Sequence, residues 1–155
     1  MTENILELLA TLTGSDNRQA YAALQDLEAI SRKSDQLLAK IPVFAEMVTS
    51  KRSFVRVRGF RLLCRQQAKW DQEGELDCLL PVALAILADS KPTVLRQALA
   101  ALHEVVKAKP QLRQLIVQQT AAIDCSKFNQ ETMAPLIEKD IAELQQLIIA
   151  LEESR

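Results

Sequence analysis

Arginine side chains form the most distinctive chemical pattern in this 155-residue sequence. Arg58, Arg61 and Arg65 follow one another at i, i+3 and i+7, which places them within about 60° of one another around a helix. Arg56 lies beside them, and Arg96 belongs to a later segment. Because a planar guanidinium group binds carboxylates and phosphates through paired hydrogen bonds, the stripe predicts contacts with an acidic peptide or a phosphate.

A solvated surface is the alternative interpretation of this stripe. The arginines are then partly paired with Asp26 or Glu104 on neighbouring helices and bind no partner. Trp70, which closes the same helix, also has two interpretations. It is either an anchor on a binding surface or a side chain that packs over the next pair of helices.

Residues that support catalysis or metal binding do not converge in the sequence. His103 is the only histidine, and it stands on a helix flank without the pattern of an acid–base site. The cysteines Cys64, Cys78 and Cys125 have no CxxC spacing, so neither a zinc site nor a disulfide framework is expected. P-loop and GxSxG motifs do not occur. We therefore expect no catalytic residue, no metal ligand and no cofactor.

The elements that must position the arginines repeat with a period of 39 residues. Three aligned columns of the repeat are Ala20/Gly59/Ala98, Leu24/Leu63/Leu102 and Leu8/Met47/Ile86. Apolar residues within each unit recur at helical spacing, and a short polar turn divides each unit into two helices. The small side chains of the first column indicate that paired helices approach closely there.

The repeat and the helical spacing predict an all-α fold in which eight helices form four hairpins within a single domain, residues 1–155. The fourth hairpin does not keep the 39-residue phase, as expected of a terminal unit that caps the stack. We expect the helices at 3–12, 16–32, 35–49, 53–69, 75–88, 92–108, 110–122 and 131–152. The hairpin units span about 3–32, 35–69, 75–108 and 110–152. Three glycines and five prolines are too few for the many turns of an all-β fold.

Several residues of the third unit fall on a known pattern: Leu79-Leu80-Pro81, Ile86-Leu87, Asp89, Pro92, Val94, Ala98 and Ala101-Leu102. They resemble the HEAT repeat, in which Leu-Pro opens the first helix, an aspartate ends it, and a Val-Arg pair begins the apolar pattern of the second. The second unit supplies Val55-Arg56 at those positions. The resemblance implies a right-handed α-α superhelix, the HEAT- or ARM-like solenoid, and a role as a scaffold or binding module.

Two departures from the HEAT pattern concern its charged positions. Ser50 stands where the second unit should carry the aspartate, and Leu95 stands where the third should carry the arginine. These departures argue against the Asp–Arg ladder that often links neighbouring HEAT units. The segments 68–71, 91–97 and 135–141 also resemble a family of small bacterial HEAT-like proteins with no assigned activity.

The last expected helix carries an apolar seam. Ile137, Ile141, Leu144, Ile148 and Leu151 alternate at spacings of four and three, which makes about two heptads of a coiled-coil pattern. The seam either seals the end of the stack or forms a weak dimer contact through residues 137–151. The chain is therefore expected to be a monomer or a weak dimer.

The function favoured by these observations is a non-catalytic interaction module, or scaffold. It would bind an acidic segment of a protein partner on the concave face lined by the second helices. The expected partner contacts are Arg56, Arg58, Arg61, Arg65, Trp70 and Arg96. A formal net charge of −1 argues against a general nucleic-acid binder. The alternative is a nucleic-acid binder, or an enzyme resembling the HEAT-like alkylpurine DNA glycosylases, motivated by the same stripe and Trp70.

Cysteine usage and the N-terminal residues favour a cytoplasmic protein. An odd number of cysteines fits a reducing compartment, and the first residues lack the basic region of a signal peptide. The longest uncharged apolar stretch, residues 78–88, is too short to cross a bilayer, so no membrane association is expected.

Overall fold

The computed structural model describes residues 3–154. Within that range the chain forms eight α-helices, five short 3-10 helices and no strand, so the prediction of an all-α fold is confirmed. The α-helices are α1 (Glu3–Leu12), α2 (Asn17–Lys33), α3 (Ile41–Met47), α4 (Ser53–Lys69), α5 (Leu80–Ala83), α6 (Pro92–Ala108), α7 (Arg113–Ala121) and α8 (Met133–Glu153). The 3-10 helices are η1 (Gln36–Lys40), η2 (Asp77–Leu79), η3 (Leu84–Ala88), η4 (Pro110–Leu112) and η5 (Cys125–Lys127).

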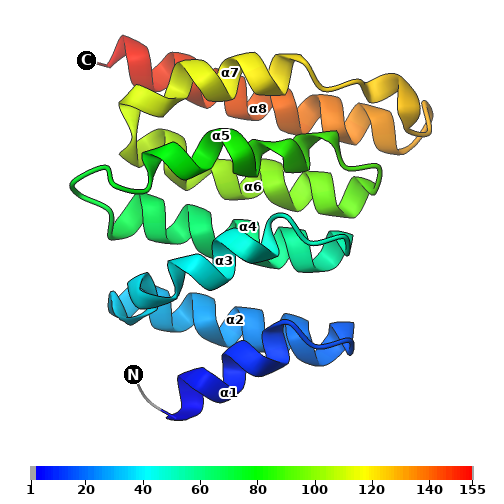
Figure 1. The fold of residues 1–155 in the computed structure, drawn as a ribbon. Coiled ribbons are helices and arrows are strands. Elements are labelled where there is room, and N and C mark those ends of the chain that lie inside the picture. The colour runs from blue at the N-terminus through cyan, green and yellow to red at the C-terminus, as the bar shows by residue number, and fades with distance from the viewer. Residues whose placement is uncertain (1–2, 155) are drawn as a thin grey trace.

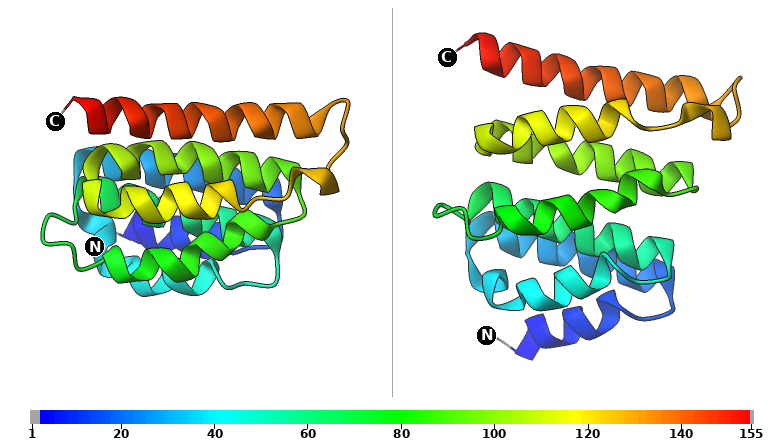
Figure 2. Two further views of the ribbon diagram at one scale, coloured as in Figure 1. Left: turned by 90° about the horizontal axis from the view of Figure 1, so that it is seen from above. Right: turned by 45° about the horizontal axis from the view of Figure 1, so that its top comes forward.

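The helices are arranged in two layers (Figures 1 and 2). One layer contains α1, α3, α5 and α7, and the other contains α2, α4, α6 and α8. In the second layer α4 contacts α2 and α6, and α6 contacts α8, so the helices stack in chain order. The turns within hairpins lie at one edge of the stack, and the connections between hairpins lie at the opposite edge.

Prolines divide the first helices of the middle units. The helix expected at 35–49 is η1 followed by α3, and Pro42 lies in the first turn of α3. The helix expected at 75–88 begins two residues later and consists of η2, α5 and η3, with Pro81 in the first turn of α5. Proline lacks the N–H that an α-helical bond to the preceding turn requires, so a new helical segment begins at each proline.

Close packing at the small-residue column is confirmed at Gly59. A Cβ atom on Gly59 would lie 2.5 Å from the Cβ of Met47 and 3.0 Å from the backbone oxygen of Phe44. Ala20 and Ala98, at the equivalent positions of α2 and α6, are fully buried. The absence of a side chain at Gly59 is therefore what allows α4 to approach α3.

Helix α8 packs its apolar seam against α6 and α7 at the end of the stack. Ile137, Leu144 and Ile148 are buried, whereas Ile149, which lies off the seam, is 57% exposed. Contacts of α8 with α6 and α7 account for this burial. The seam therefore packs within the chain, as expected if it seals the end of the stack. A dimer contact through residues 137–151 stays a prediction.

Basic side chains link neighbouring units by binding carbonyl groups at helix ends. The guanidinium of Arg52 donates to the carbonyl oxygens of Thr13 and Gly14, at 3.4 and 3.1 Å, just after the end of α1. Nζ of Lys127 donates to the carbonyl oxygen of Ala88, at 3.1 Å, at the end of η3. Each pair is separated by 38 or 39 residues, the period of the sequence repeat. Lys127 thus satisfies the last carbonyl of η3, which has no partner within the helix, and Arg52 binds two carbonyls of the turn after α1.

A buried lysine makes the corresponding link at the opposite edge. Nζ of Lys109 lies 2.8 Å from the carbonyl oxygen of Asp71, 2.9 Å from its carboxylate and 2.8 Å from the carboxylate of Asp77. Lys109 is only 4% exposed. Burial opposes ionisation of Asp77, but hydrogen bonds from Lys109 and Gln111 outweigh it and lower the pKa of Asp77. The lysine thereby fixes the connection that follows α4.

Replacement of Gly59 by alanine should destabilise the fold. Alanine favours a helix over glycine by about 1 kcal/mol. Overlap with the backbone of α3 should outweigh this gain and lower the free energy of unfolding by about 1–3 kcal/mol. Urea denaturation followed by circular dichroism measures the difference. A variant as stable as the wild type would show that α3 and α4 can separate without cost.

Replacement of Lys109 by methionine should lower the free energy of unfolding by about 3–5 kcal/mol, because it leaves Asp71 and Asp77 without their counter-charge. Lys107→Met is the matched control, since Lys107 is exposed in the last turn of α6, two residues before Lys109. Thermal and urea denaturation of both variants provide the comparison. Equal losses of unfolding free energy in the two variants would contradict a specific role of the buried Lys109 ammonium group.

Candidate binding groove

A groove follows the exposed side of α6 in the layer of second helices. It consists of two adjoining depressions of about 420 and 270 Å³, which share Gln97, Ala100 and His103. The larger depression is bordered by α2 and α4, and the smaller one by α8. We call the two together the α6 groove. Its charged lining residues are Glu28, Arg61, Arg65, Arg96, Glu104, Lys107, Asp140 and Glu143.

Arg61 joins three helices at the wall of the groove. Its Nε and Nη2 donate to the two carboxylate oxygens of Glu28 on α2, at 3.1 and 2.8 Å. Its Nη1 donates to Gln97 on α6 at 2.9 Å, and its guanidinium carbon lies 5.6 Å from the centroid of the Tyr21 ring. Burial opposes the charge of Arg61, but the hydrogen bond and charge of Glu28 outweigh it and raise the pKa of Arg61. Glu28 takes the place of the expected partner Asp26.

Arg65 makes fewer hydrogen bonds and ion pairs than Arg61. Its Nε lies 3.5 Å from a carboxylate oxygen of Glu104, the expected partner, and makes no hydrogen bond within the described part of the chain. The Arg65 side chain is 19% exposed. Burial raises the pKa of Glu104, while the charges of Arg65, Arg32 and Lys107 oppose that increase. The carboxylate of Glu28, which lines the same depression, also raises the pKa of Glu104.

Arg58 lies inside the molecule, which corrects its predicted place on the binding surface. Its Nε donates to the carbonyl oxygen of Phe54 at 2.9 Å, Nη1 to that of Leu12 at 3.1 Å, and Nη2 to Asn17 at 3.3 Å. The residue is only 3% exposed. Burial, with the charge of Arg52, lowers the pKa of Arg58. Its guanidinium fixes the end of α1 against α4 and is not available to a partner.

Arg56 also links two units. Its Nη2 forms an ion pair with Asp89 and donates to Ser53 at 2.8 Å, and its Nη1 donates to the carbonyl oxygen of Ser50 at 2.9 Å. The expectation that no Asp–Arg ladder forms is therefore wrong at this junction. The second unit has the arginine but no aspartate, and the third has the aspartate but no arginine, so together they complete one pair. Burial opposes ionisation of Asp89, but the backbone N–H of Lys91 and the guanidinium of Arg56 lower its pKa.

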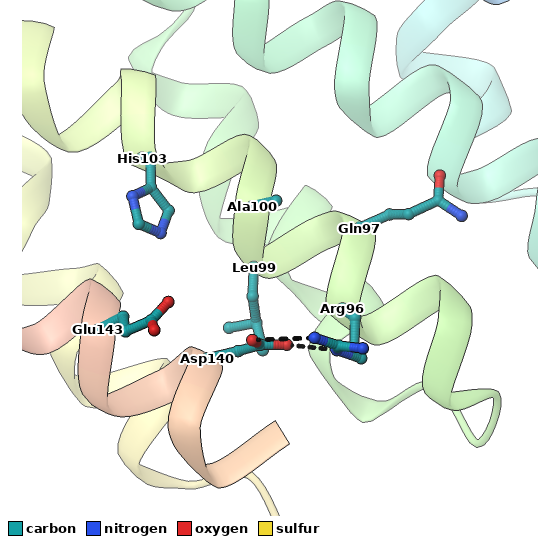
Figure 3. A pocket seen from close by; sticks show the side chains of 7 residues that line it. All are labelled: Arg96, Gln97, Leu99, Ala100, His103, Asp140 and Glu143. Carbon is teal, nitrogen blue, oxygen red and sulfur yellow. Dashed lines mark hydrogen bonds and ion pairs between the residues drawn. The ribbon is translucent and has the colours of Figure 1, made fainter. Parts of the chain in front are cut away.

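Arg96 lies at the far end of the groove, between α6 and α8. Its Nε and Nη2 donate to the carboxylate oxygens of Asp140 at 2.7 and 3.4 Å. Figure 3 shows this ion pair on one side of the depression and His103, directed toward the Glu143 side, on the other. The ion pair joins the last hairpin to the third, and 41% of the Arg96 side chain stays exposed.

Trp70 is separate from the arginines and lines a different depression. Its Nε1 donates to the carbonyl oxygen of Ser31, at the end of α2, at 2.7 Å. The neighbouring Asp71 is buried and bound to Lys109. An enzyme of the glycosylase type would require a free carboxylate beside the indole, and Asp71 is not free.

The described residues contain no metal-binding arrangement and no membrane-spanning helix. Among residues 3–154, no group of three or more histidine, cysteine, aspartate or glutamate side chains is placed to hold a metal ion. No helix in that range has the length and apolar character needed to cross a bilayer. Comparisons with known protein families, with curated proteins and with solved structures found no match.

The ion pair of Arg56 and Asp89 should make the stability of the fold depend on pH. A carboxyl group with a lowered pKa stabilises the fold above its unfolded pKa of about 3.9 and loses that contribution as pH falls toward the folded pKa. The free energy of unfolding should therefore fall below about pH 4. Arg56→Gln should make this fall shallower and reduce stability at neutral pH.

Urea denaturation at a series of pH values measures this effect. Arg18→Gln, which removes an exposed arginine on α2 outside the described ion pairs, is the control. A pH dependence unchanged by Arg56→Gln, or changed equally by both substitutions, would contradict the role assigned to the pair.

Proposed function

We propose that the chain is a HEAT-like solenoid with a right-handed superhelix, and that it acts as a non-catalytic interaction module. The architecture is supported by the two layers of helices in Figure 1 and by contacts between residues 38 or 39 apart. The Arg56–Asp89 pair adds the type of contact that links HEAT units. Its three free cysteines suit the cytoplasm, which we propose as its compartment.

The partner that we propose is an acidic protein segment bound in the α6 groove. The observation that carries this proposal is the incomplete pairing of Arg65. Its guanidinium lies in a groove, is partly exposed, and forms only a 3.5 Å ion pair with Glu104. Lys107 lines the same depression. A carboxylate of a partner would give Arg65 hydrogen bonds that Glu104 does not provide.

The remaining arginines have a supporting role in this proposal. Arg61 is held by Glu28 and Gln97, so it forms a fixed wall of the groove. Arg56 and Arg58 act within the fold, where they set the position of α4 against its neighbours. The residues proposed to contact the partner are therefore Arg65 and Lys107, and Arg61 and Arg96 border the groove.

A labelled acidic peptide tests the proposal directly. Fluorescence anisotropy of the sequence Ala-Glu-Leu-Glu-Ala-Glu-Leu should show saturable binding to the full chain that weakens with added salt. The double variant Arg65→Glu/Lys107→Glu should weaken binding by about tenfold or more, which corresponds to at least about 1.4 kcal/mol.

Arg18→Glu/Lys51→Glu is the matched control, since it makes the same change of charge at exposed residues outside the groove. It should leave the affinity nearly unchanged. Absence of binding to the wild type would overturn the proposal, and so would equal losses in the two double variants, because attraction by overall charge would then explain the result.

A further inference from the structure

We propose a second binding surface, of opposite charge, that takes a basic, apolar peptide segment of a protein partner. It is a depression of about 560 Å³ at the edge of the stack where the hairpins are connected. One wall comes from η1 and the start of α3, and the other from residues 70–76, which follow α4. We call it the Trp70 cleft. Its volume lies within the range of about 300–1,000 Å³ that is usual for ligand sites.

The cleft has an apolar floor. Leu38, Ile41, Leu76 and the indole of Trp70 line it. Leu38 and Leu76 are only partly buried, although they pack against the core. A partner side chain that covered them would gain the free energy of burying apolar surface.

The wall formed by residues 70–76 is held in place by hydrogen bonds. The indole is oriented by the hydrogen bond from Nε1 of Trp70 to Ser31, on the preceding unit. Asp71 is held by Lys109, and its carboxylate accepts the backbone N–H groups of Glu75 and Leu76. Since the loop is already ordered, a partner does not bear the entropic cost of ordering it.

The rim of the cleft is acidic. Asp35, Glu73 and Glu75 line it, are exposed, and form none of the ion pairs found within residues 3–154. No lysine or arginine is among the described residues that line it. Three unpaired carboxylates around one depression repel each other and an acidic partner, and they attract a cation. This charge complementarity selects a basic segment.

One cation of the chain already lies near the indole. Nζ of Lys69 lies 5.5 Å from the centroid of the Trp70 ring, which is within cation–π range, while Lys69 itself lines an adjacent hollow. An arginine of the partner can stack on an aromatic face and also bind carboxylates in pairs. Because the cleft combines apolar side chains with an acidic rim, a peptide with arginine next to leucine fits it better than a free small cation.

Intrinsic fluorescence provides the test, because Trp70 is the only tryptophan of the sequence. Titration of the full chain with the peptide Ala-Leu-Arg-Ala-Leu-Arg-Ala should produce a saturable change in tryptophan emission. The counterpart in which both arginines are replaced by glutamate should produce none. Calorimetry of the same mixtures gives the affinity without relying on the indole.

Charge reversal locates the site. Glu73→Lys/Glu75→Lys should weaken binding of the basic peptide by at least tenfold. The control Glu131→Lys/Glu138→Lys reverses two exposed carboxylates that line none of the described depressions named here, and it should leave the affinity unchanged. Arg65→Glu/Lys107→Glu, in the α6 groove, should not weaken binding of the basic peptide, so the two sites can fail separately.

Three results would overturn this proposal. The first is the absence of an emission change and of heat with the basic peptide. The second is an equal loss of affinity in the cleft variant and the control, because binding would then follow overall charge. The third is reversible dimerisation in sedimentation equilibrium that Glu73→Lys/Glu75→Lys abolishes, because the occupant would then be a second copy of the chain.

Discussion

Donation from side chains of one unit to backbone carbonyls of the preceding unit is the interaction on which the arrangement of this protein depends. A helix ends with carbonyl groups that have no partner within the helix and that carry partial negative charge. Arg52 and Arg58 bind those at the end of α1, and Trp70 binds that of Ser31 at the end of α2. Nζ of Lys109 likewise donates to the carbonyl oxygen of Asp71, just after α4. Apolar packing holds the layers together, while these directional bonds set how far each unit is shifted along its neighbour.

This use of cations decides which of them can serve a partner. Arg56 and Arg58 look like surface charges in the sequence because they follow the helical stripe, yet both act between units. Arg65 lies about two turns beyond Arg58 along α4, where the neighbouring helices offer Glu104 only at 3.5 Å. Arg65 is thus the arginine of the stripe that stays available to a partner, because contacts within the fold occupy the others. The carboxylates around the Trp70 cleft form a separate surface of opposite charge.

The sequence predicts the helices well and the charged contacts poorly, for identifiable reasons. Burial of apolar side chains has the period of the helix, so apolar spacing locates all eight helices, and the 39-residue repeat relates those of the first three units. The pairing of Arg61 depends on which side of α2 faces α4. Leu24, Leu27 and Glu28 lie on the buried side, and that spacing already favours Glu28 over Asp26. The link between Lys109 and Asp71 requires the path of the connection after α4, which no periodic pattern encodes.

Contacts limited to adjacent units also shape how the protein opens. The second and third units have neighbours on both sides, whereas the first and the last have one neighbour each. In such a linear array, stability is a sum of contributions from each unit and each junction, so fraying begins at the ends and moves inward. The Trp70 cleft is built from the second unit, which is among the last to lose its structure, whereas the α6 groove also borders on α2 and α8 of the terminal units and loses those borders first.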